Sequence, residues 1–403
     1  MITEKKASIS RREFLTFSSI VTLAFGLGSS SIGKGGLLGK EKVHVQRPAL
    51  TLGLFIPFKK ITDQDTLEAF KDLIFSAGAN TIVVDIKNEW GFTHVPFEHR
   101  FKPCGSYPEE NPEALSDLIS WCKRNDIYLI GRQVIMSDGK LLTAYPGLGL
   151  KHINGGIWRD LQGIPWANPI REEIADYNAA IARAAAGMGI SEIQYDYVRF
   201  PSDDSPTQYL FYEMKNTLEQ RTKAITRILR QAQDAVNQMG SLLAADVFNY
   251  TAWKNFGDMG IGQHLETMGP YVDVLSPIAY PSLFGTKLPS SDPCPNGCFP
   301  GSAYPYEVVN YTVKHAIERL AAVNPDILIV PWIQAYPDYR FQQRMSLAEF
   351  EAQQRGAFEA GARGVLAWNP SLRYDPNFYS WIKERERQQG LLLKMLEPRG
   401  IGL

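Results

Sequence analysis

Apolar runs of strand length alternate with longer segments of helical period from about residue 50 onward. This alternation predicts successive βα units around a parallel sheet. Eight runs have strand length, and they cover residues 50–57, 81–86, 127–135, 192–200, 242–249, 273–280, 327–334 and 364–368. Helices are expected over residues 65–76, 112–124, 169–188, 209–239, 306–323, 346–360 and 376–388. The predicted fold class is therefore α/β, a single-domain (β/α)8 TIM barrel.

Polar and aromatic residues gather at the C-terminal ends of these strands, where barrel enzymes place their active sites. They are Asp85, Lys87, Glu89, Trp90, Gln133, Asp196, Tyr197, Arg199, Asp246, Asn249, Tyr280, Trp332, Gln334, Trp368 and Asn369. A doubly wound open sheet is the alternative architecture. The first βα turn lacks the Gly-x-Gly-x-x-Gly pattern, and the chain has no Gly-Lys-Ser/Thr phosphate loop, so the barrel is favoured.

Two predicted connections are longer than a simple link requires, over residues 137–168 and 281–305. Long loops at this end of a barrel usually shape a substrate cleft, although they can also be surface decoration. The second loop contains Cys294 and Cys298 among many turn-forming residues, and a local disulfide between them is expected in an oxidising compartment. A zinc site is the alternative, but the chain's four cysteines lie in unequal settings without a Cys-x-x-Cys pair or a nearby His pair.

The first 45 residues differ from the rest of the chain and resemble a twin-arginine export signal with a linker. Arg11 and Arg12 precede an apolar run over residues 14–27, which is too short to span a membrane comfortably, and a Gly/Ser-rich segment follows. An uncleaved anchor and a chance Arg-Arg pair are the alternatives. The expected organisation is a signal and linker over 1–45, the barrel over 46–390 and a tail over 391–403. The mature protein is expected to be periplasmic or extracellular, without a stable membrane span.

Composition narrows the class of partner. The chain of 403 residues is 44% hydrophobic and 21% charged, with a formal net charge of -1, as in an ordinary globular protein. No basic block is present, which disfavours nucleic acid as the main partner. Patterns typical of metallohydrolases and serine hydrolases, such as His-Glu-x-x-His and Gly-x-Ser-x-Gly, are absent from the sequence, and no metal or cofactor is expected.

Two aspartates on neighbouring predicted strands are the main candidates for catalysis. Alternation places Asp196 on the inward face of the fourth strand, and Asp246 lies on the fifth strand, which neighbours the fourth at about 4.8 Å in a parallel barrel, so the two side chains could face each other. A carboxyl separation of about 5 to 5.5 Å fits a retaining glycosidase and about 6.5 to 9.5 Å an inverting one, and both remain open. Arg199 would keep Asp196 ionised, leaving Asp246 beside Phe248 as the acid. A purely structural Asp196–Arg199 ion pair is an equal alternative.

The second strand and the aromatic residues supply further candidates. Asp85 and Lys87 are expected on one face, where they bind substrate or simply pair with each other, and Glu89 is an alternative acid. Tryptophans near four strand ends, at positions 90, 253, 332 and 368, present flat apolar faces on which sugar rings stack, with core packing as the alternative for any one of them.

Several motifs resemble a known family. They are Trp166-Ala-Asn-Pro169, Tyr177-Asn178, Tyr195-Asp-Tyr-Val-Arg-Phe-Pro201, Asp246-Val-Phe248, Asp273-Val-Leu-Ser-Pro-Ile-Ala-Tyr-Pro281 and Ala367-Trp-Asn-Pro370. Together they resemble the glycoside hydrolase domain family DUF4015 over roughly residues 50 to 385. The resemblance implies a barrel related to α-amylase-like and other glycosidase barrels, in which the fourth-strand acid, Asp196 here, is the nucleophile. The fifth strand carries Asp246 where α-amylases use a glutamate.

The leading hypothesis is an exported glycoside hydrolase that cleaves a polysaccharide without a cofactor, with Asp196 as nucleophile and Asp246 as acid/base. The alternative is a catalytically inactive barrel that binds glycan. A buried ion pair that fully occupies Asp196 would favour the inactive barrel.

Overall fold

Parallel strands and helices alternate through the computed structural model, which describes residues 44–105, 113–202, 207–254, 257–284, 301–338, 345–385 and 387. These residues all belong to one compact unit that begins at His44. The predicted export signal and C-terminal tail therefore fall almost wholly outside the described residues, as do Cys294 and Cys298 with their predicted disulfide.

The described part of the chain contains one large parallel sheet. Its strands are β1 (Thr51–Ile56), β2 (Thr81–Lys87), β3 (Tyr128–Val134), β5 (Glu192–Asp196), β7 (Leu242–Val247), β8 (Val274–Pro277), β9 (Leu328–Ile329), β10 (Trp332–Gln334) and β11 (Gly364–Trp368). Hydrogen bonds link them in the order β10-β11-β1-β2-β3-β5-β7-β8-β9. Every predicted strand is present, although several are shorter than predicted.

The two ends of this order are consecutive pieces of one strand, so the sheet closes into a ring. Pro331 separates β9 from β10, and proline has no N–H with which to continue a ladder. Pairing with β8 nevertheless continues on both sides of the break. Val330 N–H, just before Pro331, donates to the Leu275 carbonyl at 3.0 Å, and Trp332, just after it, bridges Ile278 in parallel. The predicted (β/α)8 barrel is confirmed.

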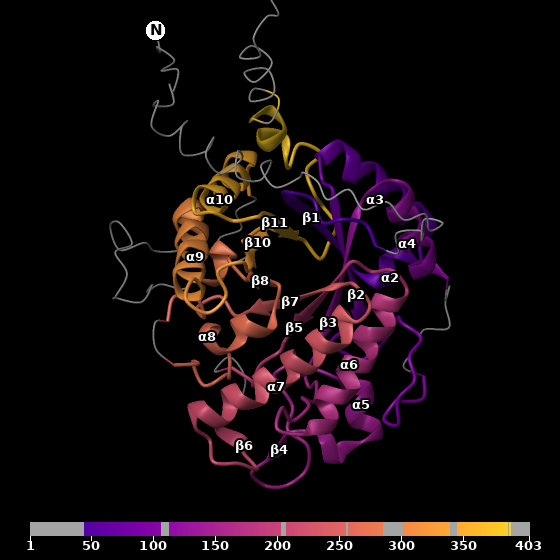
Figure 1. Cartoon of the computed structure of the whole chain (residues 1–403), viewed down its shortest axis with the longest axis vertical. Coiled ribbons are helices and arrows are strands. Elements are labelled where there is room, and N and C mark those ends of the chain that lie inside the picture. Colours follow the sequence, from indigo (N-terminus) through magenta and orange to yellow (C-terminus); the bar gives the residue numbers. More distant parts are fainter. Residues whose placement is uncertain are drawn as a thin grey trace, which may run out of the picture. The chain divides into compact units, whose positions relative to one another are not determined.

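Helices surround the sheet (Figure 1). They are α2 (Phe58–Ile61), α3 (Gln64–Ala77), α4 (Ala114–Arg124), α6 (Glu172–Gly187), α7 (Leu218–Asn237), α8 (Leu265–Met268), α9 (Pro305–Leu320) and α10 (Leu347–Glu359), with α5 (Gly139–Ala144) in the loop after β3. Residues 380–385 are helical as well. None of the helices in the described part of the chain is long and apolar enough to cross a membrane.

One predicted helix is partly wrong. Residues 209–239 have a largely helical pattern, but the helix α7 begins only at Leu218, because Thr217 caps it by accepting a hydrogen bond from Gln220 N–H. The preceding residues form a short 3₁₀ turn, Thr207–Tyr209, and the strand β6, Leu210–Phe211. β6 pairs antiparallel with β4 (Lys151–His152), and in this way the loop after β5 is joined to the long loop after β3.

Alternate positions along the strands fill the barrel with apolar side chains, as the pleat of a strand requires. The buried cluster includes Phe55, Val83, Tyr128, Ile130, Ala244, Val274, Val330, Trp332 and Leu366. Its N-terminal end contains a buried carboxyl, Glu192, which pairs with Arg47 and accepts a hydrogen bond from the Tyr128 hydroxyl at 3.0 Å. The apolar layer above this pair supports the opposite end of the barrel, where the strands end in polar residues.

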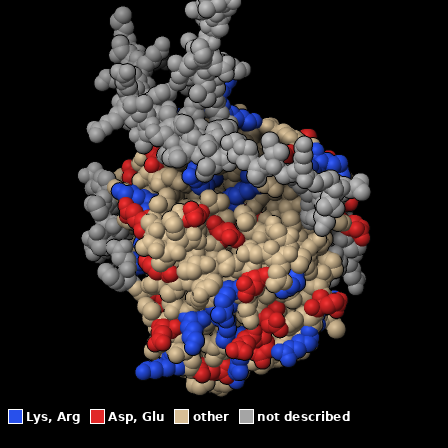
Figure 2. Space-filling model, viewed as in Figure 1, with Lys and Arg blue, Asp and Glu red and all other residues tan. Residues whose placement is uncertain are grey.

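Charged side chains of both signs are interspersed on the face shown in Figure 2, in keeping with the formal net charge of -1. A surface of this kind does not create the single-sign field that attracts a polyanion over a distance.

Candidate active site

The inward-facing carboxyl groups gather at the C-terminal ends of three strands. Asp85 comes from β2, Asp196 from β5 and Asp246 from β7. Tyr195 pairs with Ala245 in the β5–β7 ladder, so Asp196 and Asp246 occupy the next positions on two adjacent strands. All three aspartates are less than 9% exposed, which places them in the mouth of the barrel rather than on its outer surface.

A single guanidinium group, that of Arg132 on β3, binds two of these carboxylates. Its Nη1 lies 2.6 Å from Asp85 Oδ1, while its Nε and Nη2 lie 2.9 and 2.5 Å from Asp196 Oδ2. The sequence analysis did not select Arg132. The signal was present, because alternation along 128, 130 and 132 puts a charged residue on the inward face near the end of a strand.

Asp246 has a different environment from Asp196. Its Oδ1 accepts a hydrogen bond from the Trp332 indole Nε1 at 2.9 Å, and the residue is 2% exposed. Burial raises the pKa of Asp246 well above its ordinary value, and the negative charge of Asp196 raises it further. The positive charge of Arg132 and the indole hydrogen bond act in the opposite direction without cancelling the rise. Asp246 therefore stays protonated to a higher pH than an ordinary aspartate.

Aromatic rings form one wall of this site. Phe55 and Trp368 stack with centroids 4.0 Å apart, and Trp332 meets Trp368 edge to face at 5.6 Å. The Arg132 guanidinium carbon lies 5.0 Å from the centre of the Trp368 ring, a cation–π distance. Trp332 and Trp368 thus both lie where the sequence analysis expected them, and each contacts an ionisable group of the site, Asp246 and Arg132 respectively.

Tyr197 follows Asp196 in a strained backbone conformation. Its φ is 52°, a left-handed value that is rare for a bulky residue, and its N–H donates to Asp196 Oδ1 at 2.6 Å.

Burial raises the pKa of the Tyr197 phenol, and the charges of Asp196 and Glu89 add to the rise. Glu89 also acts on Asp85, whose pKa is raised to about 6, chiefly by burial and against the pull of Arg132. The structure therefore brings Glu89, Asp85, Asp196 and Tyr197 into one electrostatic neighbourhood.

Arg199 does not take the position predicted from the sequence. The carboxylate of Asp196 pairs with Arg132 instead, while Arg199 Nη1 donates to the Phe200 carbonyl. The Arg199 guanidinium lies 5.1 to 5.4 Å from the ring centres of Trp166, Tyr197 and Phe248. The expected Asp196–Arg199 pair is replaced by an Asp196–Arg132 pair, because Arg132 projects into the barrel from the adjacent strand.

Lys87 and Gln133 lie behind the strands, not in the barrel mouth. The register between β2 and β3 shifts between Asp85 and Lys87, so the expectation that these two residues share a face is wrong. The Lys87 ammonium is fully buried, 2.8 Å from Asp138 Oδ2, and donates to the Val134 carbonyl and to Asn178 Oδ1. Gln133 Nε2 also donates to Asn178 Oδ1, on α6. Burial lowers the pKa of Lys87, and Asp138 opposes this shift.

Three predicted substrate-binding amides hold loops in place. Gln334 Oε1 accepts from Ser282 N–H, Asn249 Nδ2 donates to the Leu283 carbonyl, and Asn369 Nδ2 donates to the Ala335 carbonyl. Each is 3% exposed or less. Their groups therefore shape the mouth of the barrel through the loops that they brace.

The remaining aromatic candidates differ in exposure. Tyr280 is 9% exposed and meets Tyr336 edge to face, with its pKa raised well above the ordinary value by burial and then by Tyr336, Asp246 and Asp196. Trp90 is 50% exposed at the rim, whereas Trp253 is buried and donates to Thr312 on α9. Trp90 is open to a ligand, whereas Tyr280 and Trp253 are both packed in the core.

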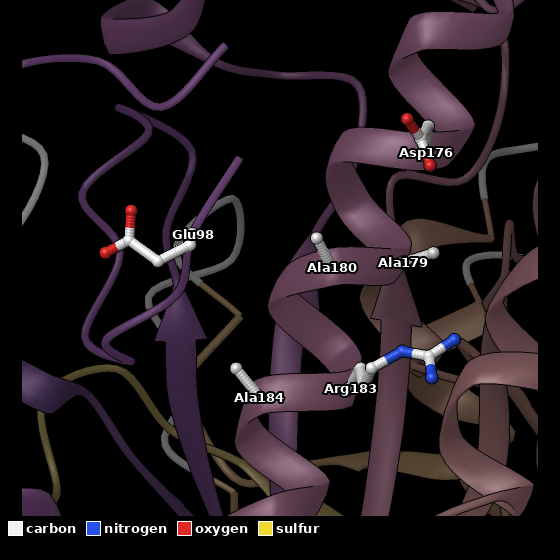
Figure 3. A pocket seen from close by; sticks show the side chains of 6 residues that line it. All are labelled: Glu98, Asp176, Ala179, Ala180, Arg183 and Ala184. Atoms are coloured by element: carbon white, nitrogen blue, oxygen red, sulfur yellow. The ribbon is translucent and has the colours of Figure 1, made fainter. Parts of the chain in front are cut away.

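A surface hollow of about 400 Å³ lies on the solvent-facing side of α6, away from these carboxyl groups. Ala180 and Ala184 point from the helix toward the segment that carries Glu98, while Asp176 and Arg183 complete the lining (Figure 3). Its two carboxyl groups, Glu98 and Asp176, have side chains that are 93% and 65% exposed, unlike the buried carboxyl groups in the barrel mouth. Within the described ranges, no group of three or more His, Cys, Asp or Glu side chains is arranged to hold a metal ion.

Comparison with known proteins assigns the family. Residues 53–374 match DUF4015, whose description is "Putative glycosyl hydrolase domain". The chain belongs to this family. Membership confirms the resemblance drawn from the motifs and makes the chain a glycoside hydrolase in general terms. No curated protein sequence matches it.

Solved glycosidase structures share the fold of this glycoside hydrolase. The PgaB (BpsB) glycoside hydrolase domain from Bordetella bronchiseptica is 11% identical, with a TM-score of 0.58 over 84% of this chain and 97% of that one. The β-galactosidase from Marinomonas ef1 is 10% identical, with a TM-score of 0.59 over 86% and 60%. The spore cortex-lytic enzyme SleL from Bacillus cereus is 10% identical, with a TM-score of 0.51 over 94% and 85%. At these identities the likeness concerns the fold.

The buried position of Lys87 predicts a structural role for this residue. Lys87→Met should lower the free energy of unfolding by about 3 to 5 kcal/mol, because it leaves Asp138 buried without its counter-ion. Urea unfolding at neutral pH measures the change. Lys314→Met, at a lysine that is 59% exposed, is the control and should stay within about 0.5 kcal/mol of the wild type. A stable Lys87→Met protein with weakened substrate binding would instead place Lys87 in the cleft.

Proposed function

We propose that this chain is an exported enzyme that hydrolyses glycosidic bonds in a polysaccharide with two carboxyl groups, Asp196 and Asp246. The observation that carries the proposal is the unequal environment of this pair. Asp196 forms a charged contact with Arg132, whereas Asp246 is enclosed, protonated to unusually high pH and bonded to a neutral indole. Glycoside hydrolysis needs this combination of one ionised and one protonated carboxyl group.

Asp196 is the proposed nucleophile. Two guanidinium N–H groups converge on its Oδ2, which fixes the carboxylate in place. Its Oδ1 accepts only the N–H of the adjacent residue, Tyr197, among the hydrogen bonds of the described residues. The attack on the anomeric carbon is therefore assigned to Oδ1.

Asp246 is the proposed acid/base. Trp332 binds its Oδ1, which leaves the second oxygen to carry the proton that the departing sugar oxygen takes up. Once the glycosyl group is attached to Asp196, the ionised Asp246 removes a proton from the incoming water, and the second displacement regenerates both groups. The apolar layer under the pair and the aromatic wall beside it keep bulk water away from the protonated carboxyl.

The strand positions support a retaining mechanism. Asp196 and Asp246 project inward from neighbouring positions on adjacent strands, which lie about 4.8 Å apart in a sheet. This spacing matches the short carboxyl separation of retaining enzymes, about 5 to 5.5 Å, rather than the longer one that leaves room for water between the groups.

A polymeric substrate is favoured by the architecture around the pair. The ring of Trp90 is exposed after β2, and Trp368 at the end of β11 is half-buried, so aromatic faces for sugar rings are offered at two strand ends. One neighbour in fold, SleL, is a spore cortex-lytic enzyme, and a second, PgaB, is a glycoside hydrolase domain. We propose a bacterial envelope glycan or an exopolysaccharide as the substrate class.

Substitution of either carboxyl group tests the function. Asp196→Asn and Asp246→Asn should each lower kcat at least about 1000-fold, because each removes a group that no neighbour replaces. The measurement is reducing-sugar release from a panel of polysaccharides at several pH values. Asp326→Asn, at an exposed aspartate before β9, is the matched control and should retain wild-type activity. Wild-type activity in Asp196→Asn would contradict the nucleophile assignment.

One observation favours a second candidate function, a glycan-binding barrel without catalysis. The Asp196–Arg132–Asp85 contacts are buried and closely satisfied, as in a structural ion-pair network. The same panel separates the two functions. The inactive barrel binds a polysaccharide in affinity electrophoresis with equal strength in wild type and Asp246→Asn, and releases no reducing sugar in either.

Export rests on the N-terminal sequence, in which Arg11 and Arg12 precede the apolar run of residues 14–27. Lys-for-Arg substitution at both positions keeps the charge and removes the pair that defines a twin-arginine signal. We expect Arg11→Lys/Arg12→Lys to leave the protein in the cytoplasm of a bacterium with this pathway, while the wild type reaches the periplasm. Immunoblots of the two fractions measure the distribution, and equal export of both forms would contradict this signal type.

A further inference from the structure

The Arg132 guanidinium is shared between carboxyl groups on both of its sides. Its Nη1 contacts Asp85, its Nε and Nη2 contact Asp196, and its charge is also felt by Asp246. The guanidinium carbon also lies 5.0 Å from the centre of the Trp368 ring. The orientation of one cation therefore decides how positive charge is divided among three buried acids.

Asp85 fixes the orientation of the Arg132 guanidinium from the β2 side, which is the side away from Asp246 on β7. The strand order β2-β3-β5-β7 puts Asp85 on one side of Arg132 and both Asp196 and Asp246 on the other. The Asp85 side chain is 10% exposed, and its Oδ1 lies 2.6 Å from Nη1. The charged groups that act on it are Arg132, Glu89 and Asp196. Asp85 therefore anchors the Arg132 guanidinium and acts on Asp196 and Asp246 through it.

We infer that Asp85 is a positioning residue, which holds Arg132 on Asp196 and away from Asp246 and thereby keeps the proton on Asp246. This inference rests on the proposed function, because it assigns Asp246 as the acid of that site. It gives Asp85 a role through Arg132 rather than a contact with substrate.

The physical basis is the balance of charges around Asp246. The groups that act on it are Asp196 and Glu192 from β5, Arg132 from β3 and the Trp332 indole from β10, while Tyr280 after β8 feels its charge in turn. Arg132 is the cation of this set. Without Asp85, one negative charge is lost and Nη1 has no partner, so more of the positive charge acts on Asp246. The pKa of Asp246 must then fall, because a nearby cation favours the carboxylate.

The hydrogen bond from Trp332 provides a readout that needs no substrate. Its indole N–H donates to Asp246, so the ¹⁵N resonance of this indole shifts when Asp246 loses its proton. The chain has eight tryptophans, and Trp332→Phe identifies the resonance by its loss. Selective ¹⁵N-indole labelling of the full chain then gives the titration midpoint of Asp246 in each variant.

Asp85→Asn is the central variant. We expect the Trp332 midpoint to move to lower pH by about one pH unit, since the change removes one negative charge and replaces the charged contact of Nη1 with a weaker, neutral one. Asp85→Glu retains the charge and should bring the midpoint back toward the wild-type value. Asp326→Asn removes an exposed carboxyl before β9 and should leave the Trp332 midpoint unchanged. If Asp85→Asn fails to fold, Arg132→Lys reports on the same contact, because lysine cannot hold both acids in a fork and should also move the midpoint.

The result separates this inference from the proposed function. A midpoint in Asp85→Asn equal to that of the wild type would overturn the inference, whatever the activity. A shifted midpoint in a protein that hydrolyses none of the polysaccharides supports the role of Asp85 and contradicts the enzyme. Where hydrolysis is present, the alkaline limb of the kcat profile of Asp85→Asn should move to lower pH with the NMR midpoint. A merely structural role would lower kcat at every pH without moving that limb.

Discussion

The contact between Arg132 and the carboxylates of Asp196 and Asp85 is the interaction on which the site depends. Three charges are placed in the mouth of a barrel, where each would be costly alone, and the short contacts between them compensate for the loss of water. Aromatic packing of the guanidinium on Trp368 restricts it further. Because the cation is committed to Asp85 and Asp196, the donor that binds the Asp246 carboxyl group in the described structure is a neutral indole.

The barrel beneath makes this asymmetry possible. Its interior is filled by apolar side chains, and the polar contact between Gln194 and Ser276 inside it, at 3.1 Å, is neutral. Such a layer cannot stabilise the negative charge of an ionised Asp246. Burial is therefore the largest cause of the raised pKa of Asp246. Behind the strands, the Lys87–Asp138 pair ties the end of β2 to the loop after β3 and supports the mouth from outside.

Regular features of the fold could be predicted from the sequence, and contacts between strands could not. Each strand contains enough apolar or alternating residues to be identified alone, and Asp196 and Asp246 follow from their positions at strand ends. The partner of Asp196 was mistaken because sequence proximity favoured Arg199, while the sheet brings Arg132 from the adjacent strand. Lys87 was placed on the wrong face because a register shift inside β2 interrupts the alternation. The start of α7 is set by the N-cap at Thr217, and the spacing of hydrophobic residues alone does not show where such a cap lies.

The central claim is that Asp196 forms a covalent bond to the sugar while Asp246 supplies the proton. Mass spectrometry of the protein after reaction with a 2-deoxy-2-fluoro glycoside of the hydrolysed sugar tests it most directly, because fluorine slows the release of a glycosyl-enzyme intermediate. The account predicts a stable adduct of one fluoroglycosyl group, located in the peptide that contains Tyr195-Asp-Tyr197. An adduct on Asp246 or on Glu89, or an enzyme that hydrolyses the polymer and forms no adduct, would contradict it.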